Sequence, residues 1–374
     1  MNKSRLLFQT LVTVIFLVAS TLSLAGCAQP TPAPTTQPEV KPSDTAVPTE
    51  APTATTAPTA TTAPTATTAP TATKELATIR FGGQIYPDDY MLEGMPEIWT
   101  EAGVKVEHTL FANAADSNKA LLSGAIDINV ASDSRTVELF NANPGQIVIL
   151  AVNAYGGDRY STIVKADSKY KTWYDLKGKT VALNLGTGAE QVVRRYFEKV
   201  GDLKWEDFKW VNLKVGDQIA ALKDGKIEAF TAWEPTPAIA ESQGVGRVLM
   251  SYGQVAKAPV FLNTTKKFAD AHHEELVRFM VAELKKAKLI KDDPQKAAEI
   301  AAQAASAAGA TASADAFKRI FDRVSFEITM SQEAIDALKD TANFLVTTGQ
   351  SKSVPEFIWD SSFLDEATKI VAGQ

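Results

Sequence analysis

The sequence predicts an α/β fold with two lobes, each a mainly parallel sheet flanked by helices, and a ligand cleft between the lobes. Residues 75–374 are long enough to form two hydrophobic cores. Helical segments alternate with short apolar strands, which is typical of parallel sheets covered on both faces. A helix, a glycine and a strand also occur twice in the same order, which indicates an internal duplication.

The chain begins with the pattern of an export signal. Lys3 and Arg5 precede an apolar run that ends at Leu24-Ala25-Gly26-Cys27, a small-residue cleavage site. This ending resembles the lipobox of bacterial lipoproteins, in which the cysteine is lipidated. We therefore expect residues 1–27 to be a lipoprotein signal peptide and Cys27 to anchor the protein at the extracytoplasmic face of a cell membrane. The alternative is an uncleaved transmembrane helix, because the run is just long enough to span.

Residues 28–74 have the composition of a tether. They contain more than half of the chain's 18 prolines, and Ala-Pro-Thr-Ala-Thr-Thr is repeated at 51–56, 57–62 and 63–68. Frequent proline without apolar periodicity favours an extended chain that cannot pack. We expect a disordered segment between anchor and folded part, with a composition that permits O-glycosylation.

The composition excludes or disfavours several function classes. A single cysteine rules out intrachain disulfides and Cys-based metal clusters, and three histidines make a His-rich metal centre unexpected. The net charge of −6, which becomes more negative when Lys3 and Arg5 are removed, argues against a nucleic-acid partner and a polybasic membrane patch. We expect neither a cofactor nor a metal.

The duplication is read from paired landmarks. These are Asp116 and Asp217, Gly124 and Gly225, the strands 78–81 and 180–183, and the strands 128–131 and 229–232. We expect each aspartate to be an N-cap and each glycine to end the helix in a left-handed conformation.

Four loops follow the ends of these strands, where ligands bind in open α/β sheets. The loops are residues 82–86, 132–135, 186–188 and 233–235. If the two lobes face each other with their strand ends inward, all four loops line one cleft.

Several short sequences occur in a characteristic order. They are residues 122–127 (LSGAID), 163–168 (IVKADS), 175–182 (DLKGKTVA), 186–188 (GTG), 220–230 (AALKDGKIEAF) and 233–235 (WEP). This set resembles the substrate-binding proteins of nitrate/sulfonate/taurine-type ABC importers over roughly residues 75–270. The resemblance implies a two-lobed, type 2 periplasmic-binding-protein-like fold with a hinged cleft that delivers a small solute to a membrane permease.

Two crossovers between the lobes are expected, near 160–166 and near 255–262. They divide the folded part into lobe 1, residues 75–162 and 260–374, and lobe 2, residues 163–259. Lobe closure on a solute is the usual switching motion of such a fold. Helices with 3.6-residue periodicity are expected at 274–288, 294–307, 314–324 and 332–347, and we expect them to complete lobe 1 and to carry structure more than chemistry.

The loop Gly186-Thr187-Gly188 precedes a helix and is a candidate anion site. Free amides at a helix N-terminus attract negative charge, and the resemblance implies that this loop holds the ligand's acidic group. Thr187-x-x-Glu190 also reads as a capping box, in which case the two side chains merely cap the helix and Glu190 disfavours an anion.

Four more positions in the strand-end loops are candidates for ligand contact. Trp233 either forms an aromatic wall of the cleft or belongs to the core, and its equivalent in the repeat is Ser132. Gln84 and Tyr86 occupy the first loop, where the resembled family contacts its ligand, and both can form hydrogen bonds.

Asp133 and Glu234 are equivalent in the repeat and place one carboxylate in each lobe. They are candidates to receive an amino group, although solvated loop charges are the commoner fate of such residues. A glycosidase-like pair is conceivable, but neighbouring residues give no sign of a tuned acid and base. Arg135 and Arg159 are candidate counter-charges for an acid, or else surface and hinge residues.

The expected function is that of a lipid-anchored, extracytoplasmic solute-binding protein. It captures a small anionic or zwitterionic solute, similar to a sulfonate, taurine or nitrate, and delivers it to the transmembrane subunits of an ABC importer. We expect a monomer and no enzymatic activity. The alternatives are a binder of a thiamine-pyrimidine-type precursor or other heterocycle, an enzyme resembling the pyrimidine-precursor synthases of thiamine biosynthesis, and a surface sensor.

Overall fold

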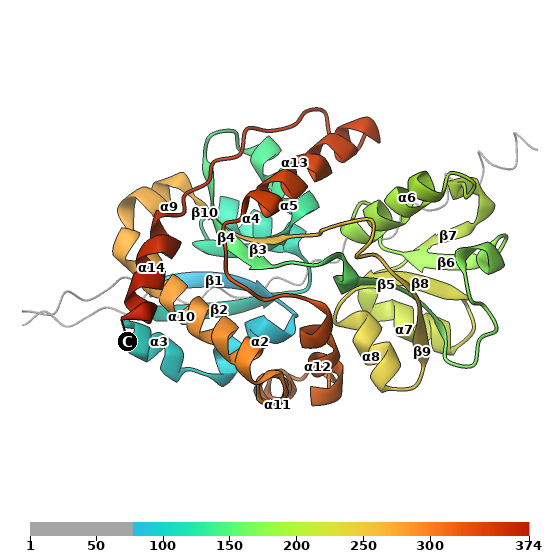
Figure 1. Ribbon diagram of the computed structural model, residues 1–374, viewed down its shortest axis with the longest axis horizontal. Coiled ribbons are helices and arrows are strands. Elements are labelled where there is room, and N and C mark those ends of the chain that lie inside the picture. Colours follow the sequence, from blue (N-terminus) through green and yellow to red (C-terminus); the bar gives the residue numbers. More distant parts are fainter. Residues whose placement is uncertain (1–77, 374) are drawn as a thin grey trace, which may run out of the picture. The chain divides into compact units, whose positions relative to one another are not determined.

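Two five-stranded sheets lie side by side in the computed structural model, which describes residues 78–373 (Figure 1). The strand orders are β2-β1-β3-β10-β4 and β7-β6-β8-β5-β9. One strand of each sheet, β10 or β5, is antiparallel to both of its neighbours, so the sheets are mixed. The predicted signal peptide, Cys27 and the predicted tether lie outside the described residues.

The strands are short, and the central ones are largely buried, as expected for sheets covered on both faces, while the edge strands β2, β7 and β9 are mostly half-buried or exposed. The first sheet contains β1 (Thr78–Gln84), β2 (Lys105–Phe111), β3 (Ile128–Ser132), β4 (Ile147–Ala154) and β10 (Val260–Thr265), and the second contains β5 (Tyr160–Lys165), β6 (Thr180–Leu183), β7 (Lys209–Asn212), β8 (Ala229–Trp233) and β9 (Gly246–Ser251). We call each sheet with the helices around it a lobe.

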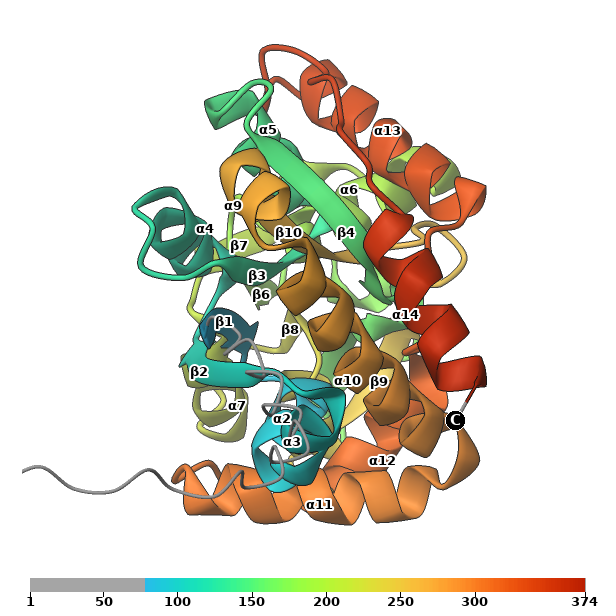
Figure 2. The same ribbon diagram turned by 90° about the vertical axis from the view of Figure 1, so that its left-hand side faces the viewer.

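Helices cover both sheets (Figures 1 and 2). Around the first sheet lie α2 (Pro87–Gly94), α3 (Glu97–Ala102), α4 (Ala114–Leu122), α5 (Asp133–Ala142), α9 (Lys266–Ala271), α10 (His273–Asp292), α11 (Pro294–Ala307), α13 (Gln332–Thr347) and α14 (Ser362–Ala372). Around the second lie α6 (Gly188–Val200), α7 (Val215–Lys223), α8 (Thr236–Ser242) and the 3₁₀ turns η2 (Trp173–Leu176) and η3 (Trp205–Asp207). The turn η1 (Gly157–Arg159) and helix α12 (Ala314–Arg323) lie where the lobes meet.

The internal duplication is confirmed by the topology. In both sheets the first strand of the repeat pairs in parallel with the next two, as β1 does with β2 and β3 and β6 with β7 and β8. Asp127 Oδ2 accepts a hydrogen bond from the Arg80 amide (2.9 Å), and Glu228 Oε2 accepts one from the Thr180 amide (3.0 Å). The glycines that end α4 and α7 both have φ of +73°.

The predicted N-caps of the duplicated helices are wrong by three residues. The caps are Asn113 for α4 and Lys214 for α7, while Asp116 and Asp217 lie in the first turns. Asn113 Oδ1 accepts a hydrogen bond from the Asp116 amide (3.1 Å), which is the ordinary geometry of an N-cap.

Two segments cross between the sheets, after β4 and after β9. The second predicted boundary, at residue 260, coincides with the start of β10. The first, between residues 162 and 163, falls inside β5, so residues 160–162 belong to a strand of the second sheet. After α12 the chain returns along the first sheet, with bridges from Ser325 to Tyr155 and from Thr329 to Val152.

The four helices predicted near the C-terminus are confirmed as α10 to α13. The expectation that all four complete lobe 1 is only partly correct, because α12 also packs on α8 of the second lobe. Phe317 and Ile320 of α12 share a core with first-lobe residues and with Ala238 of α8. Among the described residues, no helix is both long and apolar enough to cross a membrane.

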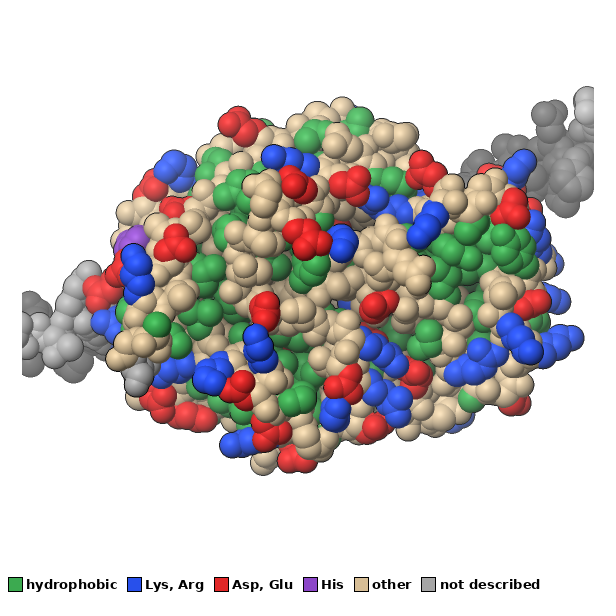
Figure 3. Space-filling view, viewed as in Figure 1, with side chains coloured by type: hydrophobic (Ala, Val, Ile, Leu, Met, Phe, Trp, Pro, Cys, Tyr) green, Lys and Arg blue, Asp and Glu red, His purple; other side chains and the backbone are tan. Residues whose placement is uncertain are grey.

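The second lobe has a core rich in aromatic residues. Trp173 is fully buried and contacts the rings of Phe197 and Phe208 edge to face, while these two rings stack on each other. Hydrophobic side chains also reach the surface near α6 and β7 (Figure 3), where Trp205 and Trp210 stack with ring centres 4.0 Å apart.

Candidate ligand-binding site

A cavity of about 520 Å³ lies between the strand ends of the two sheets. It is lined by both lobes and by the hinge, through Gln84, Ala112, Asn113, Ala114, Asp116, Ser132, Arg135, Arg159, Tyr160, Asn184, Thr187, Gly188, Lys214, Val215, Gly216, Asp217 and Trp233. This volume is typical of small-molecule sites. Residues from strand-end loops of both lobes therefore line one cavity, as predicted.

Four helices begin at this cavity, because their N-cap residues all line it. The caps are Asn113 of α4, Ser132 of α5, Thr187 of α6 and Lys214 of α7. Only Asn113 uses its side chain to cap its helix; the other three starts have no side-chain cap. At α5 the Asp133 amide donates to the Pro259 carbonyl (3.0 Å) and the Ser134 amide to Asp133 Oδ1 (2.8 Å). The starts of α6 and α7 are the better anion sites, because uncapped amides and the partial positive charge of a helix N-terminus favour an anion.

Arg159 is the most unusual residue of the lining. It is only 5% exposed, and among the described residues its Nε and Nη1 atoms have no hydrogen-bond partner. Its guanidinium carbon lies 5.8 Å from the ring centre of Tyr86 and 5.1 Å from that of Tyr160. A buried guanidinium without a hydrogen-bonded acid is costly.

The charge of Arg159 is maintained by its surroundings. Burial acts to lower the pKa of the guanidinium, but the neighbouring oxygens of Tyr160, Tyr86 and Asp133 act in the opposite direction, and the net shift of the pKa is upward. Arg159 therefore remains a cation in the interior.

Aromatic side chains form one wall of the cavity. Tyr160 and Trp233 lie opposite each other in the pairing of β5 with β8, and both line the cavity. The Tyr160 hydroxyl packs against the start of α6, where a Cβ added to Gly188 would lie 2.1 Å from it. Gly188 is therefore required for close approach of this tyrosine to the helix.

The other residues of the first two loops divide between cavity and interior. Gln84 lines the cavity, and its side-chain amide is held by a hydrogen bond to the Val130 carbonyl (2.9 Å). Ser132 also lines it. Tyr86 is buried outside the lining, near the Arg159 guanidinium.

The predicted capping box at α6 is not formed. Thr187 Oγ1 donates to the Asn184 carbonyl (2.6 Å) and makes no cap. Glu190 accepts from the Gly186 amide (2.7 Å) and from Arg194 Nε (2.7 Å). Both oxygens of the Glu190 carboxylate are therefore occupied by groups of the same segment. Thr187 and Gly188 line the cavity, whereas Gly186 does not.

Asp133 and Glu234 are not brought together at the cavity, and neither is a solvated loop charge. Asp133 is buried and accepts from the Ser134 amide (2.8 Å) and Thr341 Oγ1 (2.8 Å). Glu234 is fully buried and accepts from the Ala238 amide and Arg323 Nη1 (both 2.9 Å). Burial raises the pKa of Glu234 to about 7, although the Ala238 amide and Arg323 oppose the shift.

The charged rim of the cavity was missed at the sequence level. Asp116, Asp217 and Lys214 line it and were not ligand candidates, whereas Arg135, a predicted counter-charge, also lines it and places its Nη1 2.5 Å from Glu138 Oε2. The spacing Asn113-x-x-Asp116 is a capping signal that places the helix start, and with it Asp116, at the strand end. For Asn184 and Tyr160 no comparable signal exists, since only the fold shows which way they point.

Within residues 78–373, no group of three or more His, Cys, Asp or Glu side chains is arranged to hold a metal ion. The cavity lining thus offers hydrogen-bond donors, an interior cation and an acidic rim.

Comparisons with known proteins place the chain in a family. Residues 99–297 match the model of the NMT1/THI5-like family, and the chain belongs to this family. A Brucella abortus (strain 2308) protein whose name describes a binding protein is 23% identical over 266 residues, 68% of this chain and 80% of that protein.

Solved structures share the fold. The periplasmic aliphatic sulphonate binding protein SsuA of Escherichia coli matches with a TM-score of 0.65 at 20% identity, covering 76% of this chain and 92% of that one. The periplasmic nitrate-binding protein NrtA of Synechocystis PCC 6803 matches with a TM-score of 0.60 at 16% identity, covering 80% and 90%. The predicted two-lobed periplasmic-binding-protein-like fold and the family resemblance are confirmed.

Proposed function

We propose that this protein is a lipid-anchored, extracytoplasmic solute-binding protein that captures a small organic acid between its lobes. The observation that carries the proposal is the buried Arg159 guanidinium, whose Nε and Nη1 atoms have no hydrogen-bond partner among the described residues, in a cavity where α6 and α7 begin without a side-chain cap. An acidic group there would receive hydrogen bonds from both lobes and from the hinge, so binding would favour lobe closure.

The charges along the cavity suggest a ligand class. Arg159 supplies an interior positive charge, whereas Asp116 and Asp217 lie at the first turns of α4 and α7. A zwitterion with its acid on Arg159 and its amine toward the aspartates fits this polarity, and a simple organic anion fits the interior alone. The names of the sulphonate- and nitrate-binding structures support an acid of this kind.

Binding without catalysis is the proposed activity. The described residues that line the cavity include no histidine and no cysteine, two of the side chains that most often act as general base or nucleophile. The Brucella relative is also named for binding.

Anchoring, delivery and oligomeric state complete the proposal. Lipidation at Cys27 would hold a monomer near the transmembrane subunits of an ABC importer, to which the closed lobes deliver the solute. The mass of the mature N-terminal peptide tests the anchor, since Cys27→Ala should abolish the acyl adduct and release the protein from membranes.

Thermal unfolding against a ligand panel tests the binding function. The panel contains alkanesulfonates, taurine, nitrate, bicarbonate and aromatic carboxylates. A ligand that binds only the folded state adds about 2.7 kcal/mol at a hundred times its dissociation constant. We expect one acid class to stabilise the wild type and the exposed control Arg319→Gln but not Arg159→Gln. If the same acid stabilised Arg159→Gln as much as the wild type, the proposal that Arg159 binds the acid in this cavity would be contradicted.

A second candidate is a planar heterocycle such as a thiamine-pyrimidine-type precursor. The aromatic wall of Tyr160 and Trp233 favours it, because flat rings stack on such side chains. Adding aminopyrimidines to the same panel separates the two candidates: stabilisation by pyrimidines that persists in Arg159→Gln would favour the heterocycle.

A further inference from the structure

The two buried carboxylates that are equivalent in the repeat each contact one helix of the C-terminal region. Asp133, at the start of α5, accepts a hydrogen bond from Thr341 Oγ1 of α13 (2.8 Å). The same Thr341 oxygen accepts from Gln191 Nε2 of α6 (3.3 Å), which belongs to the second lobe. Asp133, Thr341 and Gln191 thus form a chain of hydrogen bonds from one lobe to the other.

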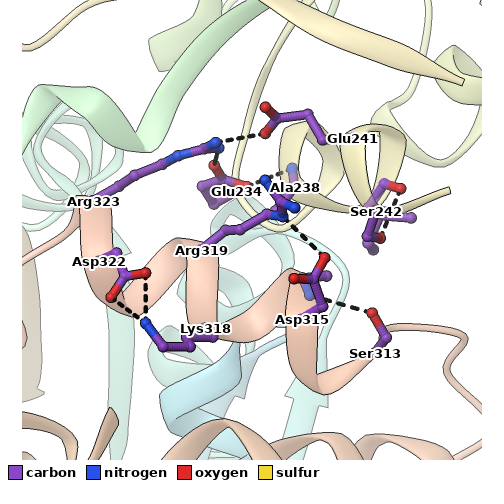
Figure 4. Close-up of polar contacts among 12 residues, drawn as sticks. Glu234, Ala238, Glu241, Ser242, Ser313, Asp315, Lys318, Arg319, Asp322 and Arg323 are labelled. Atoms are coloured by element: carbon purple, nitrogen blue, oxygen red, sulfur yellow. Dashed lines mark hydrogen bonds and ion pairs between the residues drawn. The ribbon is translucent and has the colours of Figure 1, made fainter. Parts of the chain in front are cut away.

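The equivalent carboxylate of the second lobe is held from α12 (Figure 4). Arg323, the last residue of α12, donates through Nη1 to Glu234 Oε1 (2.9 Å) and through Nη2 to Glu241 Oε2 (2.6 Å). Glu241 lies on α8, so one guanidinium bridges two carboxylates of the second lobe. Glu234 is 0% exposed, and its second oxygen accepts from the Ala238 amide.

Helix α12 is itself fixed to the first lobe. Phe317, Ile320 and Phe321 on its apolar face belong to the core that also contains residues of β1, α2 and α10. Any motion that separates α12 from α8 would therefore break both ion pairs of Arg323. It would also leave a buried carboxylate without its cation, which is strongly unfavourable.

The same contacts lead to the candidate ligand site. The Glu234 amide donates to the Arg159 carbonyl (2.8 Å), so the residue that Arg323 holds also fixes the backbone of the cavity's interior cation. On the opposite side of the hinge, Arg195 of α6 pairs with Asp340 of α13 (2.7 Å). The hinge is thus flanked by contacts of α12 and of α13 with the second lobe.

We propose that Arg323 and Thr341 form a cross-lobe clasp, built on the pseudo-equivalent carboxylates Glu234 and Asp133, that holds the lobes together and positions Arg159. The proposal deepens the proposed function and rests on it only for its effect on affinity. Arg323 and Thr341 are positioning residues that do not line the cavity. A population of separated lobes would lower the apparent affinity by the fraction that remains binding-competent.

The first test measures the lobes directly and needs no ligand. Spectroscopic labels are attached through unnatural amino acids at positions 119 and 226 of the full chain, whose lysines are 79% and 73% exposed in opposite lobes. In Arg323→Ala we expect a longer and broader distribution of distances between the labels. The matched control is Arg319→Ala on the same helix, because Arg319 pairs with Asp315 of α12 itself (3.0 Å).

The second test measures affinity with ethanesulfonate as the probe. Arg323→Ala should weaken binding roughly tenfold, within the usual range of coupling between sites, while Arg319→Ala leaves it unchanged. Arg323→Lys keeps the charge but cannot bridge Glu234 and Glu241 as a fork, so it should restore part of the affinity. Full rescue by Arg323→Lys is the result expected if Arg323 merely stabilises the C-terminus of α12, because a lysine serves the helix dipole equally well.

A third variant covers the case in which Arg323→Ala does not fold. Thr341→Val removes the hydroxyl that links Asp133 and Gln191 without changing shape. Its control is Thr347→Val on the same helix, because the Thr347 hydroxyl donates to the Asn343 carbonyl (3.0 Å) of α13 itself. Thr341→Val should broaden the label distances and Thr347→Val should not. Wild-type distances in Arg323→Ala, or in Thr341→Val where Arg323→Ala does not fold, would overturn the clasp. Failure of ethanesulfonate to bind the wild type would instead count against the proposed sulfonate function and leave the distance result standing.

Discussion

The two lobes present equivalent strand ends and one equivalent pair of helix starts to the cavity, but with different side chains. At the equivalent strand ends the first lobe has Ser132 and the second has Trp233, and at the starts of α4 and α7 they have Asn113 and Lys214. Because the duplicated backbone supplies the N-termini of α4 and α7, attraction for an anion at these two starts does not depend on the side chains. The side chains can therefore diverge, giving a small polar wall in one lobe and an aromatic, cationic wall in the other.

The largest contrast between equivalent positions should be in stability. Glu234→Ala leaves Arg323 without one of its two carboxylates and should lower the free energy of unfolding by about 3–5 kcal/mol. Asp133→Ala removes an acceptor from two neutral donors and should cost about 1–3 kcal/mol. Urea denaturation of both variants at pH 7.5 gives the comparison. Equal losses would show that the ion pair with Arg323 adds nothing beyond an ordinary hydrogen bond.

A second contrast lies in the pH dependence of stability. Burial raises the pKa of Glu234 in the second lobe to about 7 from an ordinary value of 4.5. The folded chain therefore keeps this proton up to a higher pH than the unfolded chain does, and the free energy of unfolding falls as pH rises from 4.5 to 7. Burial, assisted by the charge of Lys286, lowers the pKa of His108 in the first lobe from 6.5 to about 4. The folded chain releases that proton first, so the same free energy rises between pH 4 and 6.5.

These two contributions oppose each other, each with a limit of about 3 kcal/mol. Glu234→Gln leaves the His108 contribution alone, so the free energy of unfolding should rise more steeply with pH than in the wild type. His108→Gln leaves the Glu234 contribution alone, so the free energy of unfolding should fall with pH. Urea titrations at pH 4.5, 5.5, 6.5 and 7.5 measure both slopes. A wild-type slope in both variants would contradict the buried titrations of Glu234 and His108.

A smaller contrast should appear in ligand affinity. Trp233→Ala removes an aromatic wall and should weaken binding of a stabilising ligand roughly tenfold, whereas Ser132→Ala at the equivalent position removes one hydroxyl and should change it about twofold. Calorimetric titration of both variants with the same ligand measures the ratio. A larger effect of Ser132→Ala would assign recognition to the polar wall.

The fold was predictable because its signals are local and repeated. Apolar strands, glycines at helix ends and 3.6-residue periodicity read correctly in both halves, and Gly124 and Gly225 adopt the same left-handed conformation. The sequence also placed Gln84, Ser132, Thr187, Gly188 and Trp233 on loops that do line the cavity.

The environment of the remaining candidates depends on segments far along the chain. Asp133 accepts a hydrogen bond from Thr341 and Glu234 accepts one from Arg323. Partners so far along the chain cannot be predicted from a local sequence pattern. The burial of Arg159 results from the packing of the hinge against both lobes, which composition and spacing do not encode.

The smallest contrast concerns the caps of the duplicated helices. Asn113 caps α4 with its side chain, so Asn113→Ala should lower the free energy of unfolding by about 1 kcal/mol. Lys214 occupies the same position of α7 but makes no cap, and Lys214→Ala should stay within about 0.5 kcal/mol of the wild type. Thermal unfolding resolves the difference, and Lys214→Asn is the informative third variant, because it should stabilise α7 while occupying amides that a ligand would otherwise use. A gain in stability with a loss of affinity in Lys214→Asn would identify the uncapped start of α7 as part of the binding surface; a gain in stability with unchanged affinity would exclude it.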